Sequence, residues 1–232
     1  LTGSMNFNYQ IKVEKFQKKK NWLFDLDNTL YSPTLGIFSQ IDLRMKKFIS
    51  NKIGVTETHA FEIQKKFYKQ YGTTLYGLTK HYNINPDEFL NFVHNICLKN
   101  LNKCDALRKK IIQLPGRKFI YTNGDSKYAA KILKSLGLNN IFSDIFDIKK
   151  ANYFPKPMKT SLNKLIKNYD IKPNEIVYFD DLQKNLKTAF LKGITTVLIS
   201  SANLSEKSYI DFRFKSIINA LDMIIKTLNK KY

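Results

Sequence analysis

The sequence has few cysteines and no long apolar runs, and both features narrow the class of protein. Cys97 and Cys104 are the two cysteines among 232 residues, too few for a disulfide framework, so both are expected to be reduced. No apolar run approaches the ~18 residues that a membrane helix needs. Near the start, a run of lysines is followed by only Trp22, Leu23 and Phe24 before Asp25, which is too short for an export signal. We therefore expect a cytoplasmic protein with no membrane partner.

Arginine is also scarce, and this decides how the charge is interpreted. The chain has 39 basic and 19 acidic residues, a net charge of +20, yet its arginines are only Arg44, Arg108, Arg117 and Arg213. A charge of this size is typical of proteins that bind nucleic acid or anionic surfaces. Recognition of bases and phosphates favours the arginine fork, however. We therefore interpret the charge as a general lysine bias and expect no nucleic-acid partner, with such a binder as a remote alternative.

Short apolar segments alternate with helical patterns along most of the chain. The segments that read as buried strands are 22–24, 119–121, 176–179 and 195–199. Helices are predicted at 127–136, 158–169 and 184–192, with a terminal helix at 215–228. Continuous apolar strands separated by helices are typical of a parallel sheet covered on both faces. The predicted fold class is α/β, a doubly wound (Rossmannoid) parallel sheet.

Residues 34–102 break this alternation because their pattern is almost wholly helical. Two apolar stripes at helical spacing run through this stretch, Ile37, Ile41, Met45 and Phe48, and Ala60, Ile63, Phe67 and Tyr71. A third helix is predicted to start at Asn85, Pro86 and Glu88. We predict an all-helical cap domain at 34–102, inserted into a core domain made of 5–33 and 103–232. Residues 1–4 precede Met5 and are expected to be a remnant of expression cloning.

Four of the scarce acids occur as two pairs, each directly after a predicted strand. These are Asp25 with Asp27, and Asp180 with Asp181. Carboxylates crowded at the ends of buried strands repel one another and lose solvation, so they are stable only with a bound cation or a retained proton. Oxygen ligands of this kind suit Mg²⁺. A turn-capping role would explain one such pair, but two pairs in one sheet favour a metal site at the open end of the strands.

Two further positions follow predicted strands and suit a phosphate group. Thr122 offers a hydroxyl, and the backbone amides of Asn123 and Gly124 lie at a helix entry, where anions are favoured. Lys156 stands directly before Pro157, which we expect at the first position of the next helix.

The order of these motif residues along the chain is similar to that of a known enzyme superfamily. Asp25, Asp27 and Thr29, then Thr122, then Lys156, then the Asp180–Asp181 doublet resemble, in order, the four motifs of the haloacid dehalogenase-like (HAD) hydrolase superfamily. Response-regulator receiver domains share these residue types, but their acid pair comes first and their phosphorylated Asp follows, whereas here the Asp-x-Asp motif comes first and the adjacent acid doublet comes last. The chain is also similar to the pyrimidine 5'-nucleotidase family. The similar stretches are 25–31 with Gly36 and Phe38, Arg44 and Met45, 71–75 with Gly77 and Leu78, 87–89, Val93 and His94, 114–116 and 119–124. It departs from the family at Leu182, where serine is usual, and at Tyr128, where histidine is common.

The resemblance implies a role for each motif residue. Asp25 would be the nucleophile that forms an aspartyl phosphate, and Asp27 the general acid and base. Mg²⁺ would be held by the Asp25 carboxylate, the Asp27 backbone carbonyl and Asp181, with Asp180 as a direct or outer ligand. The remaining implied roles are phosphate binding by Thr122, Asn123 and Lys156, and support of the site by Thr29 and Asn185.

The cap would select the leaving group of the substrate. Its polar or aromatic candidates are Arg44, Tyr71, Thr73, Thr74, His81 and His94, and the turn at 72–77 is expected to form a mobile or closely approaching loop. We expect a Mg²⁺-dependent phosphatase that acts on a small phosphate ester, foremost a pyrimidine nucleoside 5'-monophosphate. A phosphatase or phosphomutase acting on sugar phosphates is the alternative, and a dehalogenase is disfavoured because it needs neither Asp27 nor the metal-binding doublet.

Overall fold

The computed structural model describes residues 15–229, so the expected cloning remnant lies outside the described residues. Its centre is a six-stranded parallel sheet with the order β3-β2-β1-β4-β5-β6. The strands are β1 (Asn21–Phe24), β2 (Arg117–Tyr121), β3 (Asp144–Phe146), β4 (Ile176–Asp180), β5 (Thr195–Ile199) and β6 (Phe212–Phe214). The four predicted strands form the middle of the sheet. The two edge strands, β3 and β6, were not predicted because three residues are too few to show a pattern.

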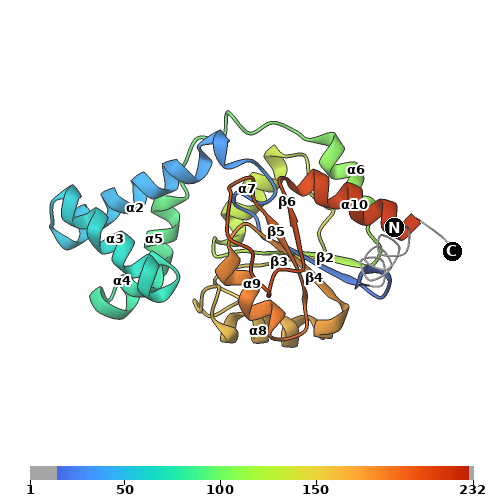
Figure 1. Ribbon diagram of the computed structural model, residues 1–232. Helices are drawn as coiled ribbons and strands as arrows, with labels where there is room; N and C mark the ends of the chain where they lie inside the picture. Colours follow the sequence, from blue (N-terminus) through green and yellow to red (C-terminus); the bar gives the residue numbers. More distant parts are fainter. Residues whose placement is uncertain (1–14, 230–232) are drawn as a thin grey trace.

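Helices cover both faces of this sheet (Figure 1). One face carries α6 (Asp105–Gln113), α7 (Ser126–Ser135) and α10 (Ile217–Asn229), and the other carries α8 (Lys159–Tyr169) and α9 (Gln183–Phe190). Side chains alternate along the strands: Trp22 and Phe24 pack in the first core, and Leu23 packs in the second. The doubly wound α/β prediction is therefore confirmed, with helix ends shifted by one or two residues.

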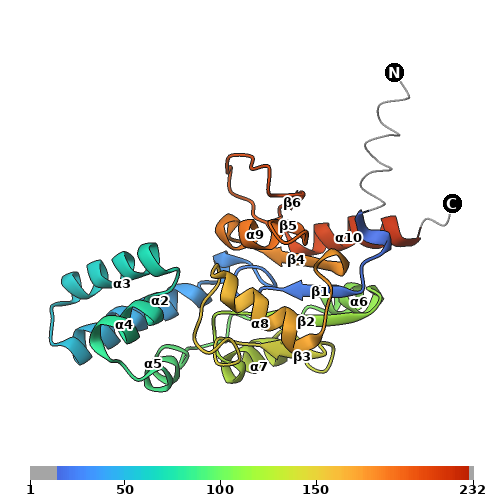
Figure 2. The same cartoon turned by 90° about the horizontal axis from the view of Figure 1, so that it is seen from below.

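Four more helices form a bundle beside the sheet, next to the carboxyl end of β1 (Figures 1 and 2). After the short turn η1 (Pro33–Leu35), they are α2 (Ile37–Ile53), α3 (Glu57–Tyr71), α4 (Thr74–Tyr82) and α5 (Pro86–Val93). A second short turn, η2 (Pro173–Glu175), precedes β4. Within the described residues, we find no helix with the length and apolarity needed to cross a membrane.

The stretch expected as a loop at 72–77 is largely helical, which corrects the sequence prediction. Thr73 caps α4 by accepting a hydrogen bond from the Tyr76 amide (3.3 Å). Gly77 lies inside α4 against Phe67, where an added Cβ would come within 2.3 Å of the ring carbon Cγ. The glycine therefore permits close packing of α3 on α4 rather than a mobile loop.

Candidate active site

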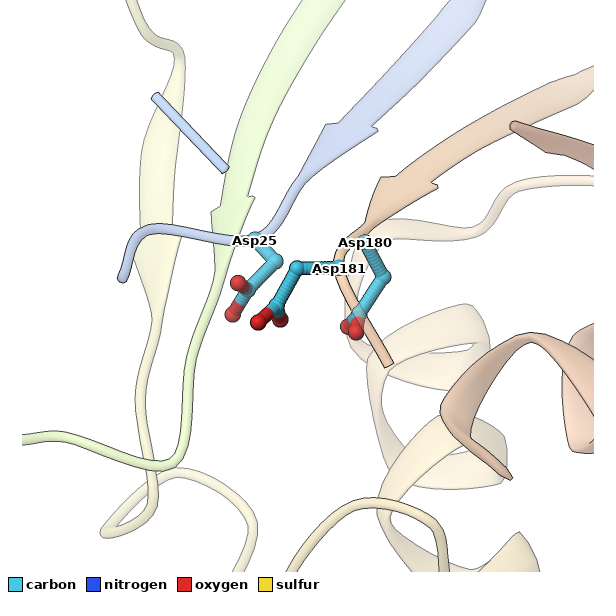
Figure 3. A group of neighbouring side chains, drawn as sticks. All are labelled: Asp25, Asp180 and Asp181. Carbon is cyan, nitrogen blue, oxygen red and sulfur yellow. The ribbon is translucent and has the colours of Figure 1, made fainter. Parts of the chain in front are cut away.

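Three carboxylates meet at the carboxyl ends of two neighbouring strands. Asp25 follows β1, Asp180 ends β4 and Asp181 comes next. Because Phe24 pairs with Phe179 in the parallel register, the two strand ends lie side by side. One oxygen of each carboxylate lies within 4.8 Å of the others, and Figure 3 shows the three side chains gathered at this edge.

The crowding of these acids perturbs their protonation. Burial, opposed by Lys156 and reinforced by Asp180 and Asp27, raises the pKa of Asp25 to about 7. Burial together with Asp25 and Asp180 raises the pKa of Asp181 to about 8. The contacts within the protein thus do not fully neutralise the negative charge of the ionised Asp25 and Asp181 carboxylates. A buried set of oxygen ligands that resists ionisation fits a hard divalent cation such as Mg²⁺.

Lys156 provides the positive charge among the acids. Its Nζ donates hydrogen bonds to Asp25 Oδ1 (2.6 Å), Asp180 Oδ2 (3.0 Å) and the Tyr121 carbonyl (2.9 Å). Burial lowers the pKa of Lys156, but Asp180 and Asp25 outweigh it and raise that pKa above its usual value. The lysine therefore stays charged.

The loop that carries Lys156 is held by a residue expected to bind phosphate. The Asn123 side chain accepts a hydrogen bond from the Lys156 amide (2.8 Å) and donates one to the Lys156 carbonyl (3.3 Å). Asn123 thus positions the lysine, while its own backbone amide as a phosphate ligand stays a prediction. The expectation that Pro157 begins the next helix is wrong: it follows a cis peptide bond, and α8 begins two residues later at Lys159.

Asp180 and Asp181 differ in how firmly they are bound. Asp180 accepts hydrogen bonds from the Leu182 amide (2.8 Å), the Asn185 side chain (2.9 and 3.0 Å) and the Tyr178 hydroxyl, besides Lys156. Within residues 15–229, the Asp181 carboxylate accepts no hydrogen bond from another residue, and its one hydrogen bond is to its own backbone amide. Asp180 is therefore fixed by its neighbours, whereas the Asp181 carboxylate is freer to bind a ligand.

Asp27 lies apart from the acid cluster, in a separate set of contacts. Its Oδ1 accepts hydrogen bonds from the hydroxyls of Tyr31 (2.5 Å) and Tyr128 (2.6 Å). Burial is the main cause that raises the pKa of both tyrosines, and the nearby charge of Asp27 is the second, so both hydroxyls stay protonated and can donate. Neither contact was predicted, although Tyr128 had been noted as a departure from the family pattern. The Asp27 carboxylate lies outside the group of three carboxylates, and its backbone carbonyl as a metal ligand stays a prediction.

Two threonines complete this end of the site. Thr29 donates a hydrogen bond to Asp25 Oδ2 (3.0 Å) and so fixes the second oxygen of that carboxylate. Thr122 is buried at the cavity wall, and its hydroxyl accepts a hydrogen bond from the Gly124 amide (3.0 Å). The accepted bond leaves the Thr122 hydroxyl proton available to an oxyanion.

Comparison with known proteins identifies the architecture. The family model for haloacid dehalogenase-like hydrolases matches residues 20–190, well over half of the chain. The chain belongs to this family.

One relative of this HAD-like hydrolase is distant in sequence. Phosphate metabolism protein 8 of Saccharomyces cerevisiae is 24% identical over 197 residues, which cover 78% of this chain and 61% of that protein. The chain thus spans less than two thirds of that relative's length.

Solved structures with the same fold include enzymes of different kinds. YfnB of Bacillus subtilis, described as a HAD-hydrolase bound to magnesium, aligns with a TM-score of 0.58 at 18% identity over 91% of this chain and 99% of its own. A HAD phosphatase of Thermococcus onnurineus gives 0.58 at 19% identity over 89% and 97%. L-2-haloacid dehalogenase of Xanthobacter autotrophicus gives 0.57 at 10% identity over 89% and 98%. At these identities the likeness shows the fold alone.

A cavity of about 320 Å³ joins the acid cluster of this HAD-like hydrolase to its helical cap. Its core end is lined by Asp25, Asp27, Thr122, Lys156 and Asp181. Its cap end is mostly apolar and is lined by residues that include Phe38, Ile41, Met45, Leu75, Phe89, Leu90 and Val93. The cavity therefore offers a ligand continuous space from the acids to the cap helices.

The cap residues predicted to contact the leaving group fall into two sets. Thr73, Thr74 and His94 line the cavity. Arg44, Tyr71 and His81 do not line the cavity, and their contact with a leaving group stays a prediction. The Arg44 Nε donates to the Phe92 carbonyl (2.7 Å), and the Tyr71 hydroxyl and His81 Nε2 are hydrogen-bonded to each other (2.6 Å). These three residues stabilise the cap internally.

Several cavity residues were not predicted because no motif marks them. Gln64 and Tyr68 from α3 line the cap end, and Lys184 lines the core side. The Lys184 Nζ lies 3.7 Å from the centre of the Tyr68 ring, a cation–π contact between core and cap. Gly72, by contrast, begins the stretch that was expected to approach closely, and it does so: an added Cβ would lie 2.9 Å from Pro157 Cδ and 3.1 Å from the Lys156 carbonyl oxygen. Such contacts join residues far apart in the sequence, so spacing alone gives no signal of them.

Proposed function

We propose that this HAD-like hydrolase is a Mg²⁺-dependent phosphomonoesterase that releases phosphate from pyrimidine nucleoside 5'-monophosphates through an aspartyl-phosphate intermediate. The observation that carries the proposal is the grouping of Asp25, Asp180 and Asp181 around Lys156, with a second carboxylate, Asp27, held two residues from Asp25. A dehalogenase would not need this acid cluster, because its leaving halide brings no phosphoryl charge to be balanced.

The proposed first step is attack of an Asp25 oxygen on phosphorus. Lys156 and Thr29 hold the two oxygens of this carboxylate, which orients the nucleophile. The bond from phosphorus to Asp25 forms as the bond to the leaving oxygen breaks. Asp27 supplies a proton to that oxygen, so the leaving group departs as an alcohol.

The second step releases the phosphate. Asp27, now ionised, removes a proton from a water molecule that attacks phosphorus, and the bond to Asp25 breaks. Tyr31 and Tyr128 donate to one Asp27 oxygen, which leaves Oδ2 to exchange the proton. Lys156 and the Thr122 hydroxyl stabilise the phosphoryl oxygens during both steps.

Asp25 and Asp181 are the side chains that would hold Mg²⁺, with Asp180 as the fixed outer support. The bound ion would offset the repulsion between Asp25 and a phosphate dianion. Asp180 is assigned the outer position because its oxygens already accept hydrogen bonds from Leu182, Asn185 and Tyr178.

The nucleotide substrate is proposed from the cap. The sequence resemblance to pyrimidine 5'-nucleotidases includes cap stretches, and the apolar cap end of the cavity suits a flat base. A sugar phosphate carries hydroxyls on all sides and is a poorer match to apolar walls.

The test is a phosphate-release panel with and without Mg²⁺. The substrates are CMP, UMP, dTMP, AMP, GMP, two sugar phosphates and p-nitrophenyl phosphate. We expect Mg²⁺-dependent release with the highest kcat/KM on a pyrimidine nucleotide. Release from sugar phosphates alone would replace the substrate assignment, and release from none would refute phosphatase activity.

The same panel separates the enzyme from a nonenzymatic binder. We propose a small phosphate ester, and not nucleic acid, as the ligand. Tight and steeply salt-dependent binding to random DNA or RNA, without any phosphate release, would favour a binder that uses the net charge of +20.

A further inference from the structure

A histidine at the end of the cap lies against one of the two tyrosines that hold Asp27. His94 is the C-cap residue of α5 and lines the cavity. Its ring stacks on the Tyr128 ring, with 4.2 Å between the ring centres and 11° between the ring planes. The Tyr128 hydroxyl donates a hydrogen bond to Asp27 Oδ1 (2.6 Å). One side chain, Tyr128, thus connects the cap to the proposed general acid.

Asp125 of the core binds both partners of this stack. It is buried at the N-cap of α7, where its Oδ1 accepts a hydrogen bond from the Tyr128 amide (2.7 Å). Its Oδ2 lies 3.4 Å from His94 Nδ1, and we assign Nδ1 as the donor because a ring nitrogen that faces a carboxylate carries a proton. Burial raises the pKa of Asp125, but the hydrogen bonds from His94 and from the Tyr128 amide outweigh it and hold that pKa below its usual value. The carboxylate is therefore ionised and a strong acceptor for both groups.

The place of the Tyr128 hydroxyl depends on how its ring is held. Asp125 fixes the Tyr128 backbone, but a rotation of the side chain would still carry the hydroxyl away from Asp27. The Tyr31 hydroxyl, 3.4 Å from that of Tyr128, donates to the same Asp27 oxygen, so both donors must be aligned on one atom. A flat ring packed nearly parallel on Tyr128 restricts this rotation.

We propose that His94 is a positioning residue: its ring holds the Tyr128 ring in place and so keeps the Tyr128 hydroxyl on Asp27. This inference rests on the proposed phosphatase function, in which Asp27 exchanges the proton. It gives the cap a second role besides the choice of leaving group, because Asp27 is fully organised only when the end of α5 lies against α7. Since His94 acts on Asp27 and not on the leaving group, its effect is the same for every ester.

Variants of His94 separate the ring from the hydrogen bond. His94→Phe keeps a flat ring but has no donor for Asp125. His94→Asn keeps a donor in the place of Nδ1 but has no ring, and His94→Leu, made alongside it, lacks both. Each is made in the wild type and in Tyr128→Phe, which keeps the stack but lacks the hydroxyl, with His59→Asn at an exposed cap histidine as control. We measure the melting temperature of each variant, and kcat and KM for phosphate release from UMP, CMP and p-nitrophenyl phosphate.

We expect both variants without a ring to lower kcat about fivefold on all three esters, the effect of one aromatic pair, with KM within about twofold of wild type. His94→Phe should keep kcat within about twofold of wild type, because the ring is what positions Tyr128. In the Tyr128→Phe background there is no hydroxyl to position, so the loss of the ring should change kcat by less than about twofold. The His59→Asn control should match the wild type.

Four results would overturn the inference. Unchanged kcat in the variants without a ring is the first, and a loss in His94→Phe as large as theirs, which would assign the effect to the hydrogen bond with Asp125, is the second. The third is a loss of the same size in the Tyr128→Phe background, as a merely structural residue would give. The fourth is a loss confined to UMP and CMP, which would make His94 a contact of the leaving group. Absence of release from every ester by the wild type would instead refute the proposed function and remove the inference with it.

Discussion

The two ends of the cavity are built on opposite principles. At the core end, each polar group makes several hydrogen bonds. Lys156 donates to three acceptors, and Asp180 accepts from a backbone amide and three side chains. At the cap end the cavity wall is more apolar, and Gln64 Oε1 is buried with no hydrogen-bond partner within residues 15–229. We therefore propose that the contacts of the core end fix the chemistry, whereas the shape and apolar character of the cap end select the leaving group.

This comparison makes a general prediction about substitutions. Changes at the core end should lower kcat for every phosphate ester alike, because each ester brings the same phosphoryl group. Changes at the cap end should alter the ranking of esters. The predictions below probe the core end.

The largest effect is expected for Asp25→Asn. An amide is a poor nucleophile, so kcat should fall at least ~10³-fold on every ester. The melting temperature should not fall, because the substitution removes one of three mutually repelling carboxylates. Phosphate release and thermal denaturation measure the two effects, with Asp170→Asn at an exposed site as control. Retention of more than a few per cent of activity, with deamidation excluded by mass spectrometry, would contradict the nucleophile assignment.

Lys156→Met should reduce both stability and activity. It leaves Asp25 and Asp180 buried without their cation, and breaking such an arrangement costs about 3–5 kcal/mol in the free energy of unfolding. Loss of its charge from the phosphoryl group should lower kcat about 10²–10³-fold. Urea denaturation at pH 7.5 measures the first effect, with Lys159→Met on the exposed face of α8 as control. Equal stability of the two variants would refute the buried role of Lys156.

Metal removal should make stability depend on pH in a defined direction. In the metal-free folded protein the pKa of Asp25 is about 7 and that of Asp181 about 8, both above the unfolded value of 3.8. The folded state then binds more protons than the unfolded state between about pH 4 and 8, so stability falls as pH rises through this window.

Thermal melts in EDTA and in Mg²⁺ from pH 5.5 to 8.5 check this expectation. The melting temperature in EDTA should fall with rising pH, and Mg²⁺ should raise it most at the alkaline end, where both carboxylates are ionised. Asp181→Asn should flatten the dependence. A Mg²⁺ effect that is equal at both ends of the range would argue against the acid cluster as the binding site.

The smallest effect is expected for Tyr128→Phe. It removes one of two donors to Asp27 Oδ1 while Tyr31 keeps the other. We expect kcat to fall about tenfold on all esters, because one donor instead of two then holds the carboxylate that exchanges the proton. Tyr82→Phe at an exposed cap position is the control. An unchanged kcat would separate Tyr128 from the proton transfer.

The sequence predicted the core end better than the cap end, for a physical reason. Asp25, Thr122 and Asp180 lie directly at strand ends, and parallel strands bring such positions to one edge of the sheet. Local position in the chain was therefore enough to place them together. The hydroxyls of Tyr31 and Tyr128 escaped prediction because a tyrosine in a helix or turn is usually part of the core.

The cap contacts depend on packing between helices, which spacing does not specify. Arg44 and His81 are polar and were expected to face the substrate, but cap residues satisfy both. Gln64 occupies a core position of α3, between Ile63 and Phe67 among the buried residues. Its hydrogen bond to Asp42 of α2 depends on how the two helices pack, which the sequence pattern does not show.

The most direct test of the account is chemical trapping of the intermediate. The enzyme is mixed with a substrate and Mg²⁺, quenched in acid within one turnover, and reduced with borohydride, which converts an aspartyl phosphate to homoserine. We predict homoserine at position 25 in the digested peptide, dependent on substrate and Mg²⁺, and none at position 27. Steady phosphate release with an unmodified Asp25, or with the modification at another residue, would contradict the central claim that Asp25 is the nucleophile.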